Sequence, residues 1–486
     1  MLRTSRRRLV PATLAGFACA AVVIAGCSAH TSTPLSKRQA SVQATTTNVS
    51  FKDCAQQCTG TIDGAAYSIK LPKQWNGTLL LWSHGYRQAN PWPPDFEPVV
   101  TTPQVSPGDT DGSGSDQLSQ QLLDQGYALA GSAYKSNGWA VADGVQADED
   151  LHAKFTALVG VPKRTYVWGA SLGGLITEIV SEQNPAWVDG AAPLCGVLAG
   201  PNLNLDLALD VAYAIKALID PQLKLTGYTS ADEATRNWEH AEAAIEKAAA
   251  DVSGGGTAKA LFIAALADAP DKSQTYDGHD LTSMVKAQVE SVLTALDYGT
   301  NGRYEIEQRV GGDPSDNTKA DYAARISTDE ASLISTAGGN VNQLVAQLDE
   351  VPRVSADQAA RDEFEKLGDT AGDLTAPTVT MHTEDDPLVI VQNEGVFAGR
   401  VQSHNDNGRL VQLYIAPPAT YDESTGAPYG AGHCNFTDKQ LLGTVNVLDN
   451  WVRKGVYPVP GGVSGELGEG LDPAYVPGPW PGTSSG

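Results

Sequence analysis

The chain has 486 residues, with 33 Lys and Arg against 57 Asp and Glu, so its formal net charge is −24 at pH 7. An acidic excess of this size favours solubility and disfavours nucleic acid and anionic membrane surfaces as partners. The charge carries no information about the fold.

The N-terminus has the features of an export signal. Four arginines between residues 3 and 8 precede an apolar segment, residues 9–25, and Ile24-Ala25-Gly26-Cys27 resembles the lipobox of bacterial lipoproteins. We expect residues 1–26 to be a signal peptide and Cys27 to be the lipidated first residue of the mature chain. An ordinary secretory signal with a later cleavage site is the alternative. Residues 5–9 also resemble a twin-arginine signal, so the export route stays open.

Both interpretations of the N-terminus place the protein outside the cytoplasm, either anchored by lipid to the cell membrane or secreted. Removal of the signal leaves 29 basic against 57 acidic residues. Residues 27–50, rich in Ser, Thr, Gln and Ala, are predicted to be a flexible tether. No later stretch is long and apolar enough to span a bilayer, so we expect contact with a membrane only through the lipid.

After the tether, strand and helix patterns alternate along the chain. Runs of strand-forming residues are followed by segments with apolar residues at three- and four-residue spacing. The predicted strands are residues 67–71, 78–82, 127–130, 166–168 and 190–194, and the predicted helices are 116–125, 145–159 and 172–183. This alternation predicts an α/β fold with a doubly wound, mostly parallel sheet. Residues 51–200 form the first part of the predicted core.

The residues around Ser171 are the most informative stretch of the chain. Gly169-Ala170-Ser171-Leu172-Gly173 matches the G-x-S-x-G pattern of a nucleophile elbow, between a predicted strand and a predicted helix. Such a turn strains the central serine, and the neighbouring glycines remove Cβ atoms that would clash. We therefore expect the Ser171 hydroxyl to project into a cleft. In a chain with 49 glycines the pattern alone is weak, so other motifs must support it.

The pattern changes after residue 200, where helix-forming residues dominate and strand candidates are absent. Gly- and Pro-containing breaks divide the segment into helices, at Pro221, residues 253–256, Pro270, residues 311–314 and residues 338–339. We predict a large helical insertion, residues 201–370, between strands 6 and 7 of the sheet. The core resumes over residues 371–456. Residues 457–486, with repeated Pro and Gly, are predicted to be an extended or disordered tail.

The second part of the core contains a candidate acid and a candidate base. A predicted strand, residues 377–382, runs into Thr383-Glu384-Asp385-Asp386-Pro387, where Asp386 is the favoured acid. Asp385 is the alternative, because the register of such a turn is easily displaced by one residue. After a further predicted strand at 410–415, His433 lies in a glycine-rich loop before a predicted helix at 437–453, and we assign it as the base.

Four motifs in this order resemble those of the α/β-hydrolases. They are the turn Ser83-His84-Gly85-Tyr86 after the third strand, the elbow at Ser171, the acid turn at Asp386 and the loop of His433. The resemblance covers residues 60–200 and 375–455. It implies a serine hydrolase of this fold, with a cap over the active site.

The resemblance also implies a role for each of these residues. Ser171 would be the nucleophile and His433 the general base, with Asp386 holding the imidazole in the correct tautomer. The backbone N–H groups of Tyr86 and Leu172 would form the oxyanion hole. His84 is expected to brace the oxyanion turn.

The cysteines are consistent with export. Outside the signal and the lipidated residue, four remain and allow three pairings: Cys54, Cys58, Cys195 and Cys434. Cys54 and Cys58 are close enough for a local disulfide, which leaves Cys195 with Cys434; the resemblance places the end of the sixth strand near the histidine loop. The alternatives are free thiols or a metal site, and metal is disfavoured because no C-x-x-C pair with a second ligand pair is present.

The His-Cys dipeptide at residue 433 is also similar to tannase-type and feruloyl esterases, where a disulfide joins the neighbours of serine and histidine. This chain departs from that pattern, because Ala170 occupies the place of the cysteine before the serine.

A complete set of nucleophile, base and acid predicts acyl transfer to water, with no cofactor and no metal. Hydrolysis of a carboxylic ester is the leading interpretation, and a serine peptidase of the prolyl or tripeptidyl aminopeptidase type is the second. A catalytically inactive binding protein is the third. The predicted cap helix at 232–250 carries charges and alanines rather than the apolar face of a lipase lid, so we expect a small ester or short peptide as substrate. The oligomeric state is left open.

Overall fold

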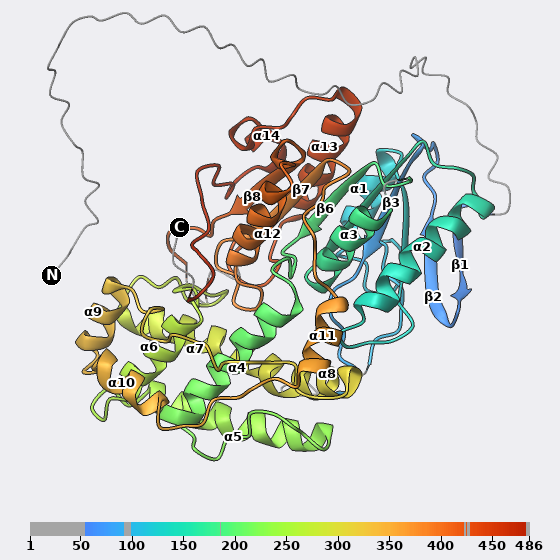
Figure 1. Ribbon diagram of the computed structural model, residues 1–486. Helices are drawn as coiled ribbons and strands as arrows, with labels where there is room; N and C mark the ends of the chain where they lie inside the picture. Colours follow the sequence, from blue (N-terminus) through green and yellow to red (C-terminus); the bar gives the residue numbers. More distant parts are fainter. Residues whose placement is uncertain (1–53, 92–98, 185, 422–423, 425–427, 483–486) are drawn as a thin grey trace, which may run out of the picture. The chain divides into compact units, whose positions relative to one another are not determined.

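The computed structural model describes residues 54–91, 99–184, 186–421, 424 and 428–482 (Figure 1). The predicted signal peptide, the lipidation site Cys27 and the tether lie outside the described residues. In the described part, no helix combines the length and the apolar character needed to cross a membrane.

The centre of the fold is an eight-stranded sheet with the order β1-β2-β4-β3-β5-β6-β7-β8. The strands are β1 (Gln57–Ile62), β2 (Ala65–Lys70), β3 (Thr78–Ser83), β4 (Ala128–Ser132), β5 (Arg164–Ala170), β6 (Gly190–Leu194), β7 (Thr378–Thr383) and β8 (Leu410–Ile415). Only the pairings of β2, with β1 and with β4, are antiparallel among these strands. This is the sheet of an α/β-hydrolase, and it confirms the predicted fold class.

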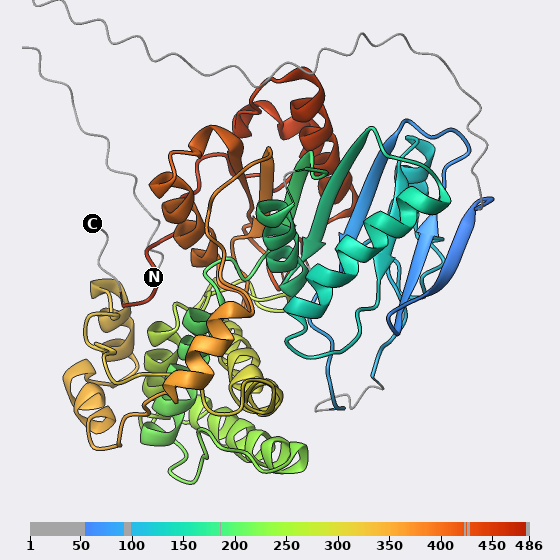
Figure 2. The same ribbon diagram turned by 45° about the vertical axis from the view of Figure 1, so that its right-hand side comes forward.

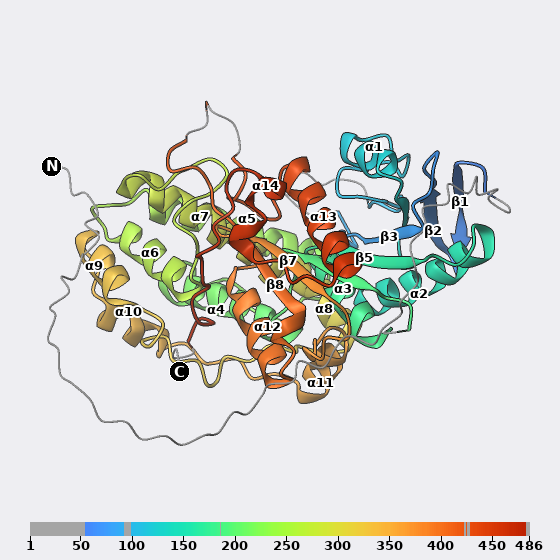
Figure 3. The same cartoon turned by 90° about the horizontal axis from the view of Figure 1, so that it is seen from above.

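Helices cover both faces of the sheet, as Figure 3 shows. The flanking helices are α1 (Gln117–Asp124), α2 (Val141–Leu158), α3 (Leu172–Gln183), α12 (Gln392–Ser403) and α13 (Asp438–Lys454). Alternate residues of a strand face opposite sides, so Leu79 packs with Phe155 of α2 on one face, whereas Leu80 packs with Leu448 of α13 on the other. Burial on both faces explains why the central strands read as continuous apolar runs.

Two features of the core differ from the sequence prediction. The edge strand β1 was not predicted, because most of its side chains are exposed and it lacks an apolar pattern. Helix α2 begins at Val141 rather than at residue 145. Its first turn contains Gly144, whose missing Cβ leaves room for the side chain of Ile176, and a glycine weakens any propensity-based prediction of a helix start.

The segment between β6 and β7 folds into helices around an apolar cluster of its own (Figure 2). It consists of α4 (Pro201–Leu218), α5 (Ala231–Ala249), α6 (Gly256–Leu266), α7 (Leu281–Asp297), the π-helical turn η1 (Tyr298–Gly302), α8 (Arg303–Val310), α9 (Thr328–Thr336), α10 (Val341–Leu348) and α11 (Gln358–Lys366). Helix α6 is buried in this cluster except at Lys259, which accounts for its predominantly apolar sequence.

The described part of the C-terminal segment, residues 457–482, forms an arm along the protein. Leu471 forms an antiparallel bridge with Ile415 of β8, and Leu467 of the short helix α14 (Ser464–Leu467) is buried against the core. Further along, Trp480 packs into the apolar cluster of the insertion. The many Pro and Gly residues therefore produce an extended path along the surface of the core.

Candidate active site

Ser171 lies at an abrupt turn between β5 and α3. Its φ of 60° and ψ of −125° are unusual for a residue with a side chain, and this is the strained conformation expected of a nucleophile elbow. A Cβ on Gly169 or Gly173 would collide with the carbonyl oxygen of Ser83 at the end of β3. Both positions thus require glycine, because β3 passes directly behind the turn.

Asp386 and His433 are brought together from two separate loops. His433 Nδ1 lies 2.8 Å from Oδ2 and 3.1 Å from Oδ1 of Asp386. The backbone N–H groups of Leu388 and Val389 both donate to Asp386 Oδ1, at 2.9 Å. Burial raises the pKa of Asp386, but the charge and hydrogen bond of His433 outweigh it, and the pKa of this carboxyl ends below its ordinary value.

Asp385, the alternative acid, points to a different place. Its backbone pairs with the glycine-rich loop, where its N–H donates to Gly430 and its carbonyl accepts from Gly432. Its side chain lines a cavity with Asp268, Glu384 and Asp386, and within the described part of the chain it makes no hydrogen bond with His433. Burial raises the pKa of Asp385 to about 7. The structure therefore places Asp386, rather than Asp385, against His433.

Ser171 and His433 line the same cavity, of about 480 Å³, which also includes Gly85 and Tyr86 from the turn after β3. Within the described part of the chain, the Ser171 hydroxyl has no direct hydrogen bond to the imidazole. Serine and base are often looser without substrate than in the reacting complex. The arrangement is therefore compatible with a serine that is deprotonated by His433 once a substrate is bound.

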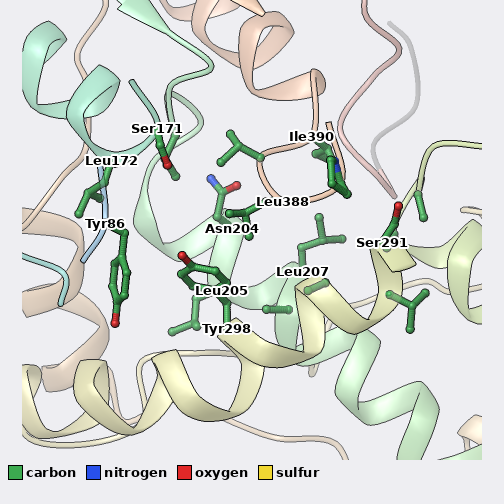
Figure 4. A pocket seen from close by; sticks show the side chains of 18 of the residues that line it. Tyr86, Ser171, Leu172, Asn204, Leu205, Leu207, Ser291, Tyr298, Leu388 and Ile390 are labelled. Carbon is green, nitrogen blue, oxygen red and sulfur yellow. The ribbon is translucent and has the colours of Figure 1, made fainter. Parts of the chain in front are cut away.

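The residues predicted for the oxyanion hole flank the serine. Leu172 is the first residue of α3, where unpaired N–H groups of a helix favour negative charge, and Figure 4 shows Tyr86 beside Leu172, near Ser171. A Cβ on Gly85 would lie 3.2 Å from the Ser171 Cβ, so the turn before Tyr86 passes close to the nucleophile.

His84 is buried beneath this turn. Its ring stacks on Tyr134 with 3.8 Å between ring centroids, and its Nδ1 lies 2.7 Å from the Gly85 carbonyl oxygen. Burial, assisted by the charge of Arg87, lowers the pKa of His84 to about 3. A neutral, packed imidazole fits the bracing role expected from the sequence.

Two disulfides are present among the described residues. Cys54 joins Cys58 near the start of β1, and Cys195 joins Cys434 across 239 positions of sequence. The second bond connects the residue after β6 to the residue after His433. The histidine loop is thereby attached to the sheet beside the elbow.

A buried histidine behind Asp386 was not assigned any role from the sequence. His382 Nε2 lies 2.8 Å from the Val389 carbonyl oxygen and 3.6 Å from Asp386 Oδ2, and its Nδ1 lies 3.3 Å from Glu394. Burial acts to lower the pKa of His382, but the hydrogen bond to Glu394 and the Asp386 charge outweigh it and raise the pKa. The only feature of the sequence that could have pointed to His382 was its position four residues before Asp386.

A second cavity, more closed than the first and called the enclosed cavity below, extends from Ser171 toward the insertion. Its volume is about 80 Å³, and most of its lining side chains are apolar. Leu205, Leu207 and Ala208 come from α4, and Ser291, Val292 and Ala295 from α7. Figure 4 shows Ser171 at one end and Ser291 with Ile390 at the other. These residues were not predicted, because only the packing of the insertion brings them to the site.

No family model matches the chain. It is 23% identical over 438 residues to an o-phthalyl amidase from Xanthobacter agilis, which covers 82% of this chain and 87% of that protein.

Similar solved structures include two esterases and a peptidase. The rice cell wall degrading esterase LipA from Xanthomonas oryzae has 14% identity and a TM-score of 0.34, covering 75% of this chain and 80% of its own. Feruloyl esterase B from Aspergillus oryzae has 15% identity and a TM-score of 0.36, and the match covers 83% of this chain and 80% of that esterase. The proline iminopeptidase from Mycobacterium smegmatis has 12% identity and a TM-score of 0.35, and the match covers 82% of this chain and 98% of that peptidase. The similarities are thus to hydrolases of ester and amide bonds.

Proposed function

We propose that the protein is an extracytoplasmic serine hydrolase whose main reaction is the hydrolysis of a carboxylic ester. The observation that carries this proposal is the convergence of Ser171, at a strained strand-to-helix turn, and His433, backed by Asp386, on one cavity. Nothing in the fold alone requires these three side chains to meet, so their convergence favours catalysis over an inactive binding protein.

The proposed reaction has two halves. In the first, His433 Nε2 accepts the Ser171 proton while the hydroxyl oxygen attacks the ester carbonyl, and the resulting oxyanion is bound by the N–H groups of Tyr86 and Leu172. The proton then passes from His433 to the departing alcohol, which leaves an acyl-enzyme. In the second half, His433 activates a water molecule, which releases the acid and restores Ser171.

The same acyl-enzyme chemistry serves amides, and the sequence similarity to an amidase favours amide hydrolysis as the second candidate. The two functions are separated by the relative turnover of an ester and an anilide of the same acid. A large excess of ester turnover supports esterase activity, whereas comparable turnover supports the amidase.

The location outside the cytoplasm is part of the proposal. Disulfides are favoured in oxidising compartments, and the described residues contain two. We extend the proposal to lipidation at Cys27 and to a cap role for helices α4–α11, of which α4, α7 and α8 line the cavity at Ser171.

Labelling with a fluorophosphonate probe tests the nucleophile. The wild-type protein is expected to react at Ser171, because only an activated serine attacks such a probe at an appreciable rate. Ser171→Ala should abolish labelling, while Ser253→Ala, which changes an exposed serine of the insertion, should leave it intact. Mass spectrometry of the labelled peptide identifies the residue. Label on another serine, or none on a folded wild-type protein, would contradict the proposal.

A further inference from the structure

Two cavities with different chemistry meet at Ser171. The smaller, enclosed cavity extends toward Ser291, and the larger one contains His433. Ser171 lines both, together with Tyr86 and Tyr298, whose rings pack edge to face with 5.2 Å between centroids. The pair of tyrosines therefore forms part of the wall between the two cavities, and a substrate bound at Ser171 must place one part in each.

The position of His433 indicates which part goes where. The leaving group takes its proton from the imidazole, so it must lie on the side of His433. His433 lines the larger cavity but not the enclosed one. The acyl part of the substrate then extends into the enclosed cavity.

The enclosed cavity offers no partner for a charge. Among the described residues that line it, none is Asp, Glu, Lys, Arg or His. Two of its polar side chains are already paired: the Asn204 amide donates to Gly200 and Asn393 and its oxygen accepts from Asn393, and the Ser291 hydroxyl donates to Ala287 within α7. Placing an unpaired ion in such surroundings is strongly unfavourable.

The nearest group of carboxylates does not change this conclusion. Asp268, Glu384 and Asp385 line another cavity together with Asp386, whose carboxylate is already held by His433 and two backbone N–H groups. This cavity adjoins the enclosed one at Ala269 and Ile390, and Ile390 lies at the end away from Ser171. An α-amine of an aminoacyl group would lie next to the carbonyl carbon, and therefore next to Ser171. The acids are at the wrong end to hold it.

We propose that the enclosed cavity is an acyl site that selects an uncharged, apolar and slender acyl chain, and that it discriminates against acyl groups carrying a carboxylate or an α-amine. This inference rests on the proposed serine hydrolase function. A volume of about 80 Å³ spread between Ser171 and the Ser291 end suits an unbranched chain rather than a bulky ring system. A phthalyl group, which carries a carboxylate beside its acyl carbon, is an example of the acyl groups that this cavity would exclude.

The test compares kcat/KM for 4-nitrophenyl esters that share one leaving group. Hexanoate is expected to exceed both the singly charged hexanedioate monoester and the protonated 2-aminohexanoate by at least about 100-fold, the scale set by burying an unpaired charge. Comparable or faster turnover of either charged ester would overturn the proposal. This comparison needs only the wild-type protein.

Variants on α7 locate the acyl chain. Ser291→Phe fills the far end of the cavity, so kcat/KM for hexanoate should fall at least about tenfold while that for acetate stays nearly constant. Thr294→Phe, on the same helix but outside the cavity lining, is the matched control and should change neither. Ala295→Leu, a smaller change on the same lining, gives the same test if Ser291→Phe does not fold.

Equal losses for acetate and hexanoate in a folded variant would overturn the assignment of the acyl chain to this cavity. Failure of the underlying function looks different: the wild-type protein would hydrolyse none of the esters and would not react with the fluorophosphonate probe. A labelled, acetate-hydrolysing protein without the expected preference refutes the acyl site alone.

Discussion

Asp385 and Asp386 are adjacent in sequence, yet their side chains have opposite electrostatic surroundings. The Asp386 carboxylate contacts His433 and accepts two backbone N–H groups, and its pKa is lowered. Burial without such partners raises the pKa of Asp385 to about 7. Two adjacent aspartates therefore differ in charge state: Asp386 is ionised, whereas Asp385 is easily neutralised.

Asparagine at each position tests this difference. Asp386→Asn should lower kcat by about ten-thousand-fold, because the amide favours the wrong imidazole tautomer. Asp385→Asn should have little effect, since an amide resembles the neutral carboxyl that burial favours there. The measurement is kcat for the best ester substrate, with circular dichroism to show that both variants fold. Similar small losses at both positions would show that the acid lies elsewhere.

At the scale of elements, the loop between β8 and α13 depends on a bond to another element. Cys434 has a φ of 53° and Cys195 a φ of 42°, so both ends of the disulfide are in the left-handed region that residues with side chains seldom occupy. Helix α13 begins with a capping box between Thr437 and Gln440, which fixes its start close behind the loop. The Cys195–Cys434 disulfide and the N-terminal capping box of α13 together hold His433 between β6 and α13.

Loss of the Cys195–Cys434 bond should therefore reduce catalysis more than it disturbs the sheet. Cys195→Ser is expected to lower kcat, because a general base displaced by about an ångström can lose on the order of 100-fold in rate. The same change should lower the free energy of unfolding by about 5 kcal/mol in the chain-entropy picture, since the closed loop is long.

The local disulfide provides the control. Cys58→Ser removes a bond that closes only a short loop near β1, and activity should stay close to that of the wild type. Peptide mapping under non-reducing conditions checks the pairing itself. A Cys195 peptide found as a free thiol, or linked to Cys54 or Cys58, would remove the proposed attachment of the His433 loop.

At the scale of the whole molecule, two buried histidines link stability to pH with opposite signs. The pKa of His84 is lowered to about 3, so its neutral form stabilises the fold above the unfolded pKa of about 6.5, and this contribution is lost as the pH falls toward 3. The pKa of His382 is raised, so its contribution is present below about pH 6.5 and is lost as the pH rises through the folded value.

The prediction concerns the slope of the unfolding free energy against pH. Between pH 6.5 and 4, His84→Asn should reduce the slope by up to about 1.4 kcal/mol per pH unit, the effect of one proton. His382→Asn should change the slope above pH 6.5 instead. Denaturant unfolding across this range measures both. An unchanged acid slope in His84→Asn would mean that the imidazole is not held neutral in the folded protein.

The C-terminal arm connects the sheet to the helical insertion. The arm pairs with the edge strand β8 at Leu471 and reaches the cluster of the insertion at Trp480. A Pro- and Gly-rich sequence has no periodic pattern, so its contacts could not be read from the residues. What orders the arm is the unpaired edge of β8, which accepts a further segment of chain.

The sequence alone determined the features that depend on nearby residues. The elbow at Ser171 was recognisable because a strand-to-helix turn needs glycines at fixed offsets, and the order of strands and helices followed from apolar periodicity. The assignment of His433 relied only on its position after the last strand. The edge strand β1 escaped prediction because its exposed side chains leave no such pattern.

Tertiary structure alone decided which groups meet across long separations. It placed Asp386 instead of Asp385 against His433, joined Cys195 to Cys434 across 239 positions, and brought α4 and α7 to the cavity at Ser171. Local patterns report which face of an element is buried, but not what it is buried against. The lining of a cavity is settled only when the faces of distant elements pack together, because each contact depends on both partners.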